Sequence, residues 1–431
     1  MKIYIKKLKK FEWYIIAFLF LAVNTVSFFT QQRISHNLGR GWDGWMYHKL
    51  AYQLVNDMPL NAMAPYNTRI GTPFIASLFP MSDLVDSFLL VNIFANFLSI
   101  ILLNIFLKLY LKSFSTRALL LMIFMLAWQS PTRHIYYYPA LTESYYFIFS
   151  ILSLIILEKI REKYSLMKIL VYSIVIFFGT AFREAILLYA LVIPFTTNPL
   201  SSKTITIDGF MKFLSKLRLL DFSPIIFGIF SLLIINSISE PSNEDEFSFI
   251  RRSVYYFWKQ KPAAYFVACF SALGPILIIL LYNIKSVIQF LMRHQHIFVL
   301  LIGHLFLGWV GGTDTERVIF TVMPIFLILI GNSINKLKDL LNHKPLIITL
   351  IFSQAISHRY FFTLPDYPNS YESILPFFTP IGNKFPYLDL FAQHGDRFLI
   401  TIIFVQYLVF SIFILIWLYN RSVSKGNTFS S

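Results

Sequence analysis

The chain has 431 residues, of which 56% are hydrophobic, 18% aromatic and only 14% charged. A soluble domain carries roughly 25% charged residues, so this composition excludes a soluble enzyme, a disordered chain and a secreted disulfide scaffold. The formal net charge of +15 is also found in proteins that bind nucleic acid. In a chain this apolar, which is expected to be a polytopic membrane protein, the charge first indicates orientation in the membrane.

The amino-terminal segment indicates which side of the membrane the chain starts from. Five lysines fall within the first ten residues, and such a cluster is expected to stay cytoplasmic. The apolar run over 12–30 is too long for the core of a signal peptide, and no small-residue cleavage site follows it. We therefore expect an uncleaved first span.

Apolar runs continue along the chain and predict an all-α fold, a polytopic transmembrane helix bundle. A helix of roughly 20 residues crosses the hydrocarbon core of a bilayer, and the runs give about 10–12 spans. The fifth and sixth runs form either two crossings or one re-entrant hairpin. The predicted spans are 12–30, 87–107, 118–131, 143–157, 169–182, 185–197, 222–238, 263–284, 297–311, 318–334, 345–357 and 398–419.

These spans predict one transmembrane domain over 1–421 and a polar cytoplasmic tail over 422–431. With a cytoplasmic start, Lys and Arg concentrate in the inner segments, as the positive-inside rule requires, so no nucleic-acid partner is needed. We expect a multi-pass protein of the cell membrane with both termini cytoplasmic. The long loops, 31–86, 239–262 and 358–397, fall on the extracytoplasmic side and carry short interfacial helices.

Charged residues at the ends of spans are costly and therefore point to function. Asp43 precedes apolar residues at helical spacing, which predicts an amphipathic helix lying in the interface. A carboxylate can take a proton from a hydroxyl, and Arg binds phosphate through a planar, bidentate donor set. The other charged residues predicted at this mouth of the bundle are Arg69, Arg133, Glu143, Arg183, Glu184, Asp314, Glu316 and Arg317.

Each of these residues also has a structural alternative. Asp43 can cap its helix, since Asp is a preferred N-cap residue. Ion pairing with neighbouring helices is the alternative for Arg183–Glu184 and for Glu316–Arg317. Arg69 and Arg133 can instead anchor to lipid headgroups.

Motifs for metals and nucleotides are missing from the sequence. Four histidines, His134, His304, His358 and His394, show no ligand spacing such as H-E-x-x-H, so no metal site is predicted. The single cysteine, Cys269, excludes an internal disulfide and a cysteine-based metal site. There is no Gly-rich phosphate loop, G-x-S-x-G elbow or Walker motif, so the chain is not an ATP-driven pump by itself.

Two motifs in the first external loop resemble GT-C-type integral-membrane glycosyltransferases. They are Asp43-Gly44-x-x-Tyr47-x-x-x-Ala51 and Tyr66-x-x-Arg69-Ile70-x-x-Pro73. Three later elements are similar to polar points of the same family: Leu141-Thr142-Glu143, Arg183-Glu184, and Asp314-x-x-Arg317 with Pro324.

This resemblance implies a glycosyltransferase that takes a hexose from a polyprenyl-phosphate-sugar donor. The acceptor would be a lipid-linked or cell-surface glycan on the extracytoplasmic face, in polysaccharide biosynthesis of the cell envelope. Asp43 would be the catalytic base or the carboxylate that orients the acceptor. The residues implied in substrate binding are Tyr47, Arg69, Arg133, Glu143, Arg183, Glu184, Asp314 and Arg317.

The chain departs from the family at one position, and other functions stay open beside it. Many relatives pair two acids in the first loop and some use a divalent metal, whereas Asp43 stands between Trp42 and Gly44. No cofactor is therefore assigned, and a divalent metal stays open. The alternatives are a polymerase or ligase of lipid-linked polysaccharide, a transporter or flippase of a lipid-linked saccharide, and a non-catalytic scaffold.

Overall fold

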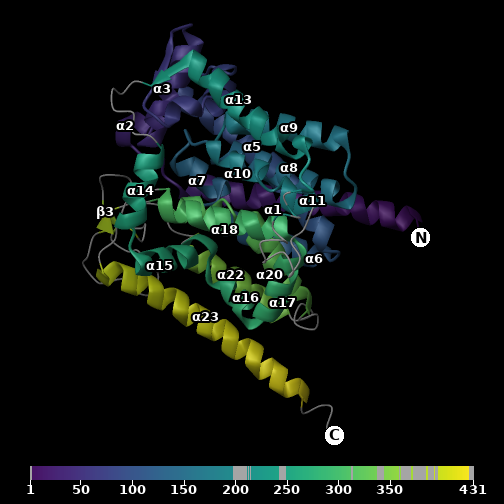
Figure 1. Cartoon of the computed structure of the whole chain (residues 1–431). Helices are drawn as coiled ribbons and strands as arrows, with labels where there is room; N and C mark the ends of the chain where they lie inside the picture. Colours follow the sequence, from purple (N-terminus) through teal and green to yellow (C-terminus); the bar gives the residue numbers. More distant parts are fainter. Residues whose placement is uncertain are drawn as a thin grey trace.

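The chain folds into helices that pack side by side, as the computed structural model in Figure 1 shows. It describes residues 2–197, 211, 213, 215–241, 249–311, 314–336, 344–358, 360, 370–371, 385–386, 393 and 397–426. Most of the predicted 358–397 loop, with His394, and the last five residues of the predicted tail lie outside these residues. Helices dominate the described part, which confirms the prediction of a mostly helical chain.

Four helical stretches among the described residues are long and apolar enough to cross a membrane. They are Phe11–Thr30, Leu84–Tyr110, Leu219–Ile238 and Ile400–Asn420. Each agrees to within three residues with a predicted span. Two bent helix pairs raise the number to six if each pair is one span. By the length and composition of its helices, the chain is a membrane protein.

The first half of the chain contributes the helices around the predicted mouth of the bundle. Those helices are α1 (Lys2–Thr30), α2 (His36–Gly39), α3 (Asp43–Val55), η1 (Tyr66–Thr68), α4 (Gly71–Ser77), α5 (Leu84–Tyr110), α6 (Phe114–Leu126), α7 (Pro131–Tyr137), α8 (Glu143–Glu162), α9 (Leu166–Thr180), η2 (Glu184–Ile186), α10 (Leu187–Ala190) and α11 (Ile193–Thr197). In Figure 1, α5, α8 and α9 lie beside one another, with α13 (Ser223–Ile238) of the second half next to α9.

The second half packs against this group, and α23 runs along one edge of the molecule (Figure 1). Its helices are η4 (Leu219–Phe222), α13 (Ser223–Ile238), α14 (Phe249–Lys259), α15 (Pro262–Leu273), η5 (Pro275–Leu277), α16 (Ile278–Tyr282), α17 (Ile284–Arg293), α18 (Gln295–Val310), α19 (Thr315–Phe320), α20 (Met323–Lys336), α22 (Lys344–Ser357) and α23 (Arg397–Gly426). Two short strand pairs complete the described part. Strand β1 (Leu60–Ala62) runs parallel to β2 (Ser239–Pro241), and β3 (Ser370–Tyr371) pairs antiparallel with β4 (Phe385–Pro386).

One predicted straight span is bent in the structure, and another begins just after a bend. The 263–284 run breaks at Gly274, whose φ of +85° and following Pro275 end α15, and the helices on either side meet at 98°. A positive φ is readily adopted only by glycine. The 297–311 run is preceded by α17, and the two helices meet at 111°. Hydropathy alone does not record the bend at Gly274, because both of its arms are apolar.

Side-chain caps set several helix starts and so fix where the charged residues fall. Asp83, Ser113, Ser130 and Ser165 each accept a hydrogen bond from a backbone N–H in the first turn of α5, α6, α7 and α9. Such caps satisfy N–H groups that have no partner within the helix. The start of α8 is held differently: Asn92 of α5 donates to two carbonyls of the 139–141 turn, just before Glu143.

Candidate active site

Asp43 occupies the first turn of α3, next to the predicted mouth of the bundle. Trp42 is the N-cap residue and no side chain caps the helix, so the capping alternative for Asp43 is not the arrangement found. A carboxylate in the first turn is still favoured by the helix dipole. The side chain of Asp43 is mostly covered by neighbouring groups but keeps 21% of its surface exposed. A ligand can therefore reach it.

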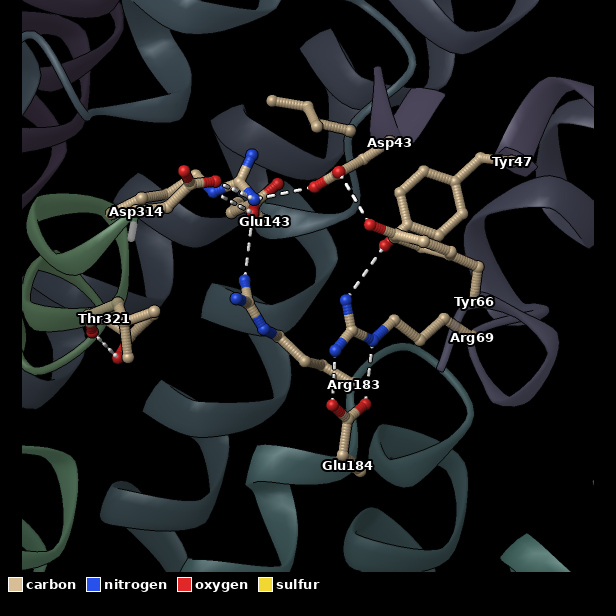
Figure 2. A network of polar contacts seen from close by, with 12 residues as sticks. Asp43, Tyr47, Tyr66, Arg69, Glu143, Arg183, Glu184, Asp314 and Thr321 are labelled. Carbon is tan, nitrogen blue, oxygen red and sulfur yellow. Dashed lines mark hydrogen bonds and ion pairs between the residues drawn. The ribbon is translucent and has the colours of Figure 1, made fainter. Parts of the chain in front are cut away.

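Both oxygens of Asp43 accept hydrogen bonds from side chains distant in sequence. The Tyr66 hydroxyl donates to Oδ1 at 2.8 Å (Figure 2). Arg317 Nη2 donates to Oδ2 at 2.7 Å. Burial by itself raises the pKa of Asp43, but the charge of Arg317 and these two hydrogen bonds outweigh it. The pKa of Asp43 therefore lies below its ordinary value, and the residue is ionised at neutral pH.

Arg317 lies between three carboxylates. Besides Asp43, its Nη2 contacts Asp314 Oδ2 at 2.8 Å, and its Nε lies 3.5 Å from Glu143 Oε1. The same Glu143 oxygen accepts a hydrogen bond from Arg183 Nη1 at 2.9 Å. Glu143 Oε2 is buried and has no hydrogen-bond partner among the described residues. It is the one acceptor oxygen of Glu143 that a bound hydroxyl could use.

A second ion pair extends the site towards η1. Arg69 forms a bidentate contact with Glu184, with Nε donating to Oε2 at 2.8 Å and Nη2 donating to Oε1. Arg69 Nη1 also donates to the Tyr47 hydroxyl at 3.2 Å. The Tyr47 ring meets the Tyr66 ring edge to face at 5.5 Å, so the Arg69–Glu184 pair adjoins the Asp43 pair (Figure 2).

Small residues let α3 approach the 138–140 segment closely. The backbone N–H of Gly44 donates to the Tyr138 hydroxyl at 2.7 Å. A Cβ on Gly44 would lie 2.7 Å from the Tyr138 ring, and one on Gly41, where φ is +65°, would lie 2.5 Å from it. The Gly-x-x-Gly spacing around Asp43 therefore places this carboxylate against the segment that precedes Glu143.

The whole network carries more negative than positive charge. It contains the carboxylates of Asp43, Glu143, Glu184 and Asp314 and the guanidiniums of Arg69, Arg183 and Arg317. Every one of these guanidiniums already contacts a carboxylate. A cavity of about 10 Å³ beside Glu143, His134 and Arg317 has room for about one water-sized group. Because all three guanidiniums already contact carboxylates, an anion binds one of them by exchanging partners with a carboxylate.

The structure brings eight of the nine predicted site residues into this network. The eight are Asp43, Tyr47, Arg69, Glu143, Arg183, Glu184, Asp314 and Arg317. Arg133 is elsewhere: it is fully buried in α7 and donates to the backbone carbonyl of His358. The alternative of ion pairs with neighbouring helices describes both arginines, since Arg183 pairs with Glu143 of α8, and Arg317 pairs with Asp43 of α3 and with Glu143. Arg317 also pairs with Asp314, three residues before it.

Three residues at the site were not among the predicted site residues. Tyr66 binds Asp43, Tyr138 binds the backbone beside it, and His134 lines the small cavity. Tyr66 stands in the Tyr66-x-x-Arg69 motif and could have been identified from the sequence, whereas the positions of the other two depend on how α7 packs.

Comparison with known proteins adds no relative, because no family model, curated protein or solved structure matches the chain.

Proposed function

We propose that the chain is an integral-membrane glycosyltransferase that moves a sugar from a polyprenyl-phosphate donor to a glycan or glycolipid acceptor. The observation that carries this proposal is the Asp43 carboxylate held between Tyr66 and Arg317, with two further arginines in the same network. Such a set supplies a base for a hydroxyl and cations for a phosphate.

An apolar groove supports a donor carried by lipid. It has a volume of about 340 Å³ and lies between α9 and α13, lined by Ile174, Phe177, Phe178, Ile226, Phe227 and Phe230. Phe178 precedes Arg183 by five residues at the end of α9. A polyprenyl chain lying in this groove would place its phosphate near the arginines, and it would reach the site from within the bilayer.

The proposed step is a displacement at the anomeric carbon. The acceptor oxygen bonds to that carbon, the bond from the carbon to the phosphate oxygen breaks, and polyprenyl phosphate leaves with the electron pair. The hydroxyl proton passes to Asp43. Arginines stabilise the charge that develops on the leaving phosphate, and this effect is stronger in a site shielded from water.

Arginine supplies the cationic charge at this site. Arg317 stands among Asp43, Glu143 and Asp314, the position that a divalent cation would need in order to contact the same carboxylates. A metal and this guanidinium therefore do not fit together in the arrangement described. The proposal routes no step through a metal.

Orientation follows from charge. We place the Lys- and Arg-rich segments and both termini in the cytoplasm and the Asp43 network on the extracytoplasmic face of the cell membrane. The proposed bundle has about 10–12 crossings, with shorter helices such as α9, 15 residues long, completing the spans.

Sugar transfer by isolated membranes tests the proposal. Membranes with equal amounts of wild type, D43N or D86N would receive labelled polyprenyl-phosphate hexoses and crude acceptor lipid. Asp86 pairs with Arg33 on the surface and serves as the matched control. We expect transfer with wild type and D86N and loss with D43N.

Other outcomes point to other functions. Chain elongation from a lipid-diphosphate oligosaccharide, without transfer from any phosphate-linked hexose, would replace the proposal by a polymerase or ligase. Movement of a labelled lipid-linked saccharide across vesicles without new glycosidic bonds would replace it by a transporter or flippase.

A further inference from the structure

A second polar cluster lies at the opposite end of α8 from Glu143. Glu158 follows Glu143 by 15 residues, which is about 22 Å along a helix. His294 and His296 come from the bend between α17 and α18. Glu158 and His296 are almost fully buried, with exposures of 4% and 1%. The proposed sugar transfer uses none of these residues.

Three donor atoms converge in this cluster. Glu158, His294 and His296 each offer one ligand atom, and these three atoms all lie within 4.8 Å of one another. His296 Nε2 lies 2.8 Å from Glu158 Oε1, at hydrogen-bond distance, whereas His294 Nδ1 lies 3.7 Å from the same oxygen. A separation of 3.7 Å is too long for a hydrogen bond. His294 Nδ1 is nevertheless buried and has no hydrogen-bond partner within the described part of the chain.

Neighbouring side chains hold the three groups in place. Arg161 donates to the other oxygen, Glu158 Oε2, from Nε at 2.9 Å and approaches it with Nη2 at 2.7 Å. The His294 ring stacks on Phe290 at 4.2 Å. The Tyr110 hydroxyl, at the end of α5, donates to Glu158 Oε1. Arg161 thus orients the carboxylate so that Oε1 faces both imidazoles, as outer partners of metal ligands do.

We propose that Glu158, His294 and His296 form a binding site for a divalent transition metal, with Zn²⁺ as the preferred ion. Four-coordinate Zn²⁺ binds nitrogen and oxygen at about 2.0–2.1 Å, which sets its ligand atoms roughly 3.3 Å apart. Glu158 Oε1 lies 2.8 Å from His296 Nε2 and 3.7 Å from His294 Nδ1, so the two separations fall on either side of this value. Small side-chain shifts therefore suffice to close the site around an ion.

The donor types decide which ion fits. Two imidazoles with one carboxylate suit Zn²⁺ and its neighbours, whereas Mg²⁺ and Ca²⁺ prefer oxygen ligands only. The fourth position is left to water or to the Tyr110 hydroxyl. The ligands come from α8 and from the α17–α18 bend. The ion therefore links this bend to the C-terminal end of α8, the helix that begins at Glu143.

Metal titration of the full chain tests this site. The protein is purified in detergent with an affinity tag free of histidine, treated with a chelator, and titrated with Co²⁺ and then Zn²⁺. We expect about one Co²⁺ per chain, with the visible absorption of a four-coordinate ion that Zn²⁺ abolishes. E158Q and H296A should lose this absorption, and H36A, which removes a histidine at the other end of the molecule, should keep it.

Two measurements on the wild type test the site independently of whether the variants fold. X-ray absorption of the Zn²⁺-loaded wild type should show two imidazoles and one carboxylate, and Zn²⁺ should raise its midpoint of thermal unfolding. An all-oxygen shell, no Co²⁺ binding at about 100 µM, or equal binding by wild type, E158Q and H296A would overturn the proposal.

Discussion

Replacing Asp43 by asparagine separates its chemical role from its structural role. The amide has the same shape and keeps one acceptor oxygen for Tyr66 or Arg317, but it cannot take a proton. Both native contacts are short, 2.8 Å from Tyr66 and 2.7 Å from Arg317. If Asp43 is the base, the D43N variant keeps its fold and loses transfer.

The cost of D43N in stability follows from its partners. A hydrogen bond to a charged group contributes about 1.5–3 kcal/mol. Breaking a buried pair costs about 3–5 kcal/mol when it leaves one charge alone. Arg317 is not left alone, because Asp314 and Glu143 remain beside it. We therefore expect D43N to lower the free energy of unfolding by only about 1–2 kcal/mol.

The expected loss of activity is much larger. A positioned general base contributes typically about 10²–10⁴-fold, so kcat for sugar transfer should fall by that factor in D43N. D314N is the matched comparison, because Asp314 contacts the same Arg317 nitrogen at 2.8 Å without the proposed base function. It should lose no more than about tenfold, within the range of one hydrogen bond.

Initial rates of transfer and thermal unfolding in detergent are measured on the same preparations. Together they distinguish a catalytic role of Asp43 from a structural one. Equal losses of kcat in D43N and D314N would mean that Asp43 acts only by holding Arg317. A large loss of folded protein in D43N alone would assign it a structural role. Full activity of D43N would remove it from the chemistry.

Three further substitutions probe the same region. R69A leaves Glu184 without its bidentate partner, so thermal unfolding should show a loss of up to about 3–5 kcal/mol, which removing both partners partly restores. Y66F removes a hydrogen bond that lowers the pKa of Asp43, so the acid limb of the pH–rate profile should move to higher pH. Burial lowers the pKa of His48 to about 4 from 6.5; the unfolded chain therefore binds more protons between these values, and stability falls as pH drops from 6.5 towards 4. H48Q should reduce this pH dependence of the unfolding midpoint, and an unchanged dependence would contradict the reasoning.

Periodicity predicted much of what surrounds the site. The helical spacing after Trp42 predicted α3, and the side of the membrane assigned to each loop brought Arg69, Glu143 and Arg183 together before any contact was known. The structure places these three residues in one network, while the side of the membrane on which they lie stays a prediction. These inferences need no knowledge of how side chains pack.

Which charged residues pair with each other depends on side-chain packing and could not be predicted from the sequence. Arg183 and Glu184 are neighbours in sequence, yet they point to different partners, Glu143 and Arg69. Arg133 looked equivalent to the other arginines, but α7 turns it into the interior. The His294–His296 pair has no ligand spacing of its own, since its carboxylate lies 136 residues earlier in α8.

If the chain is the proposed glycosyltransferase, the ion pair on Asp43 predicts that the basicity of this carboxylate changes during the reaction cycle. While Arg317 is paired with Asp43, it lowers the pKa of Asp43, which makes the carboxylate a weak base. A donor phosphate that takes Arg317 removes this effect and adds a negative charge nearby, and both changes raise the pKa of Asp43. The pH profile of kcat/KM reports the free enzyme and that of kcat reports the substrate complex. We therefore expect the acid limb of kcat at a higher pH than that of kcat/KM. Coincident limbs would show that Arg317 stays on Asp43 when the donor binds.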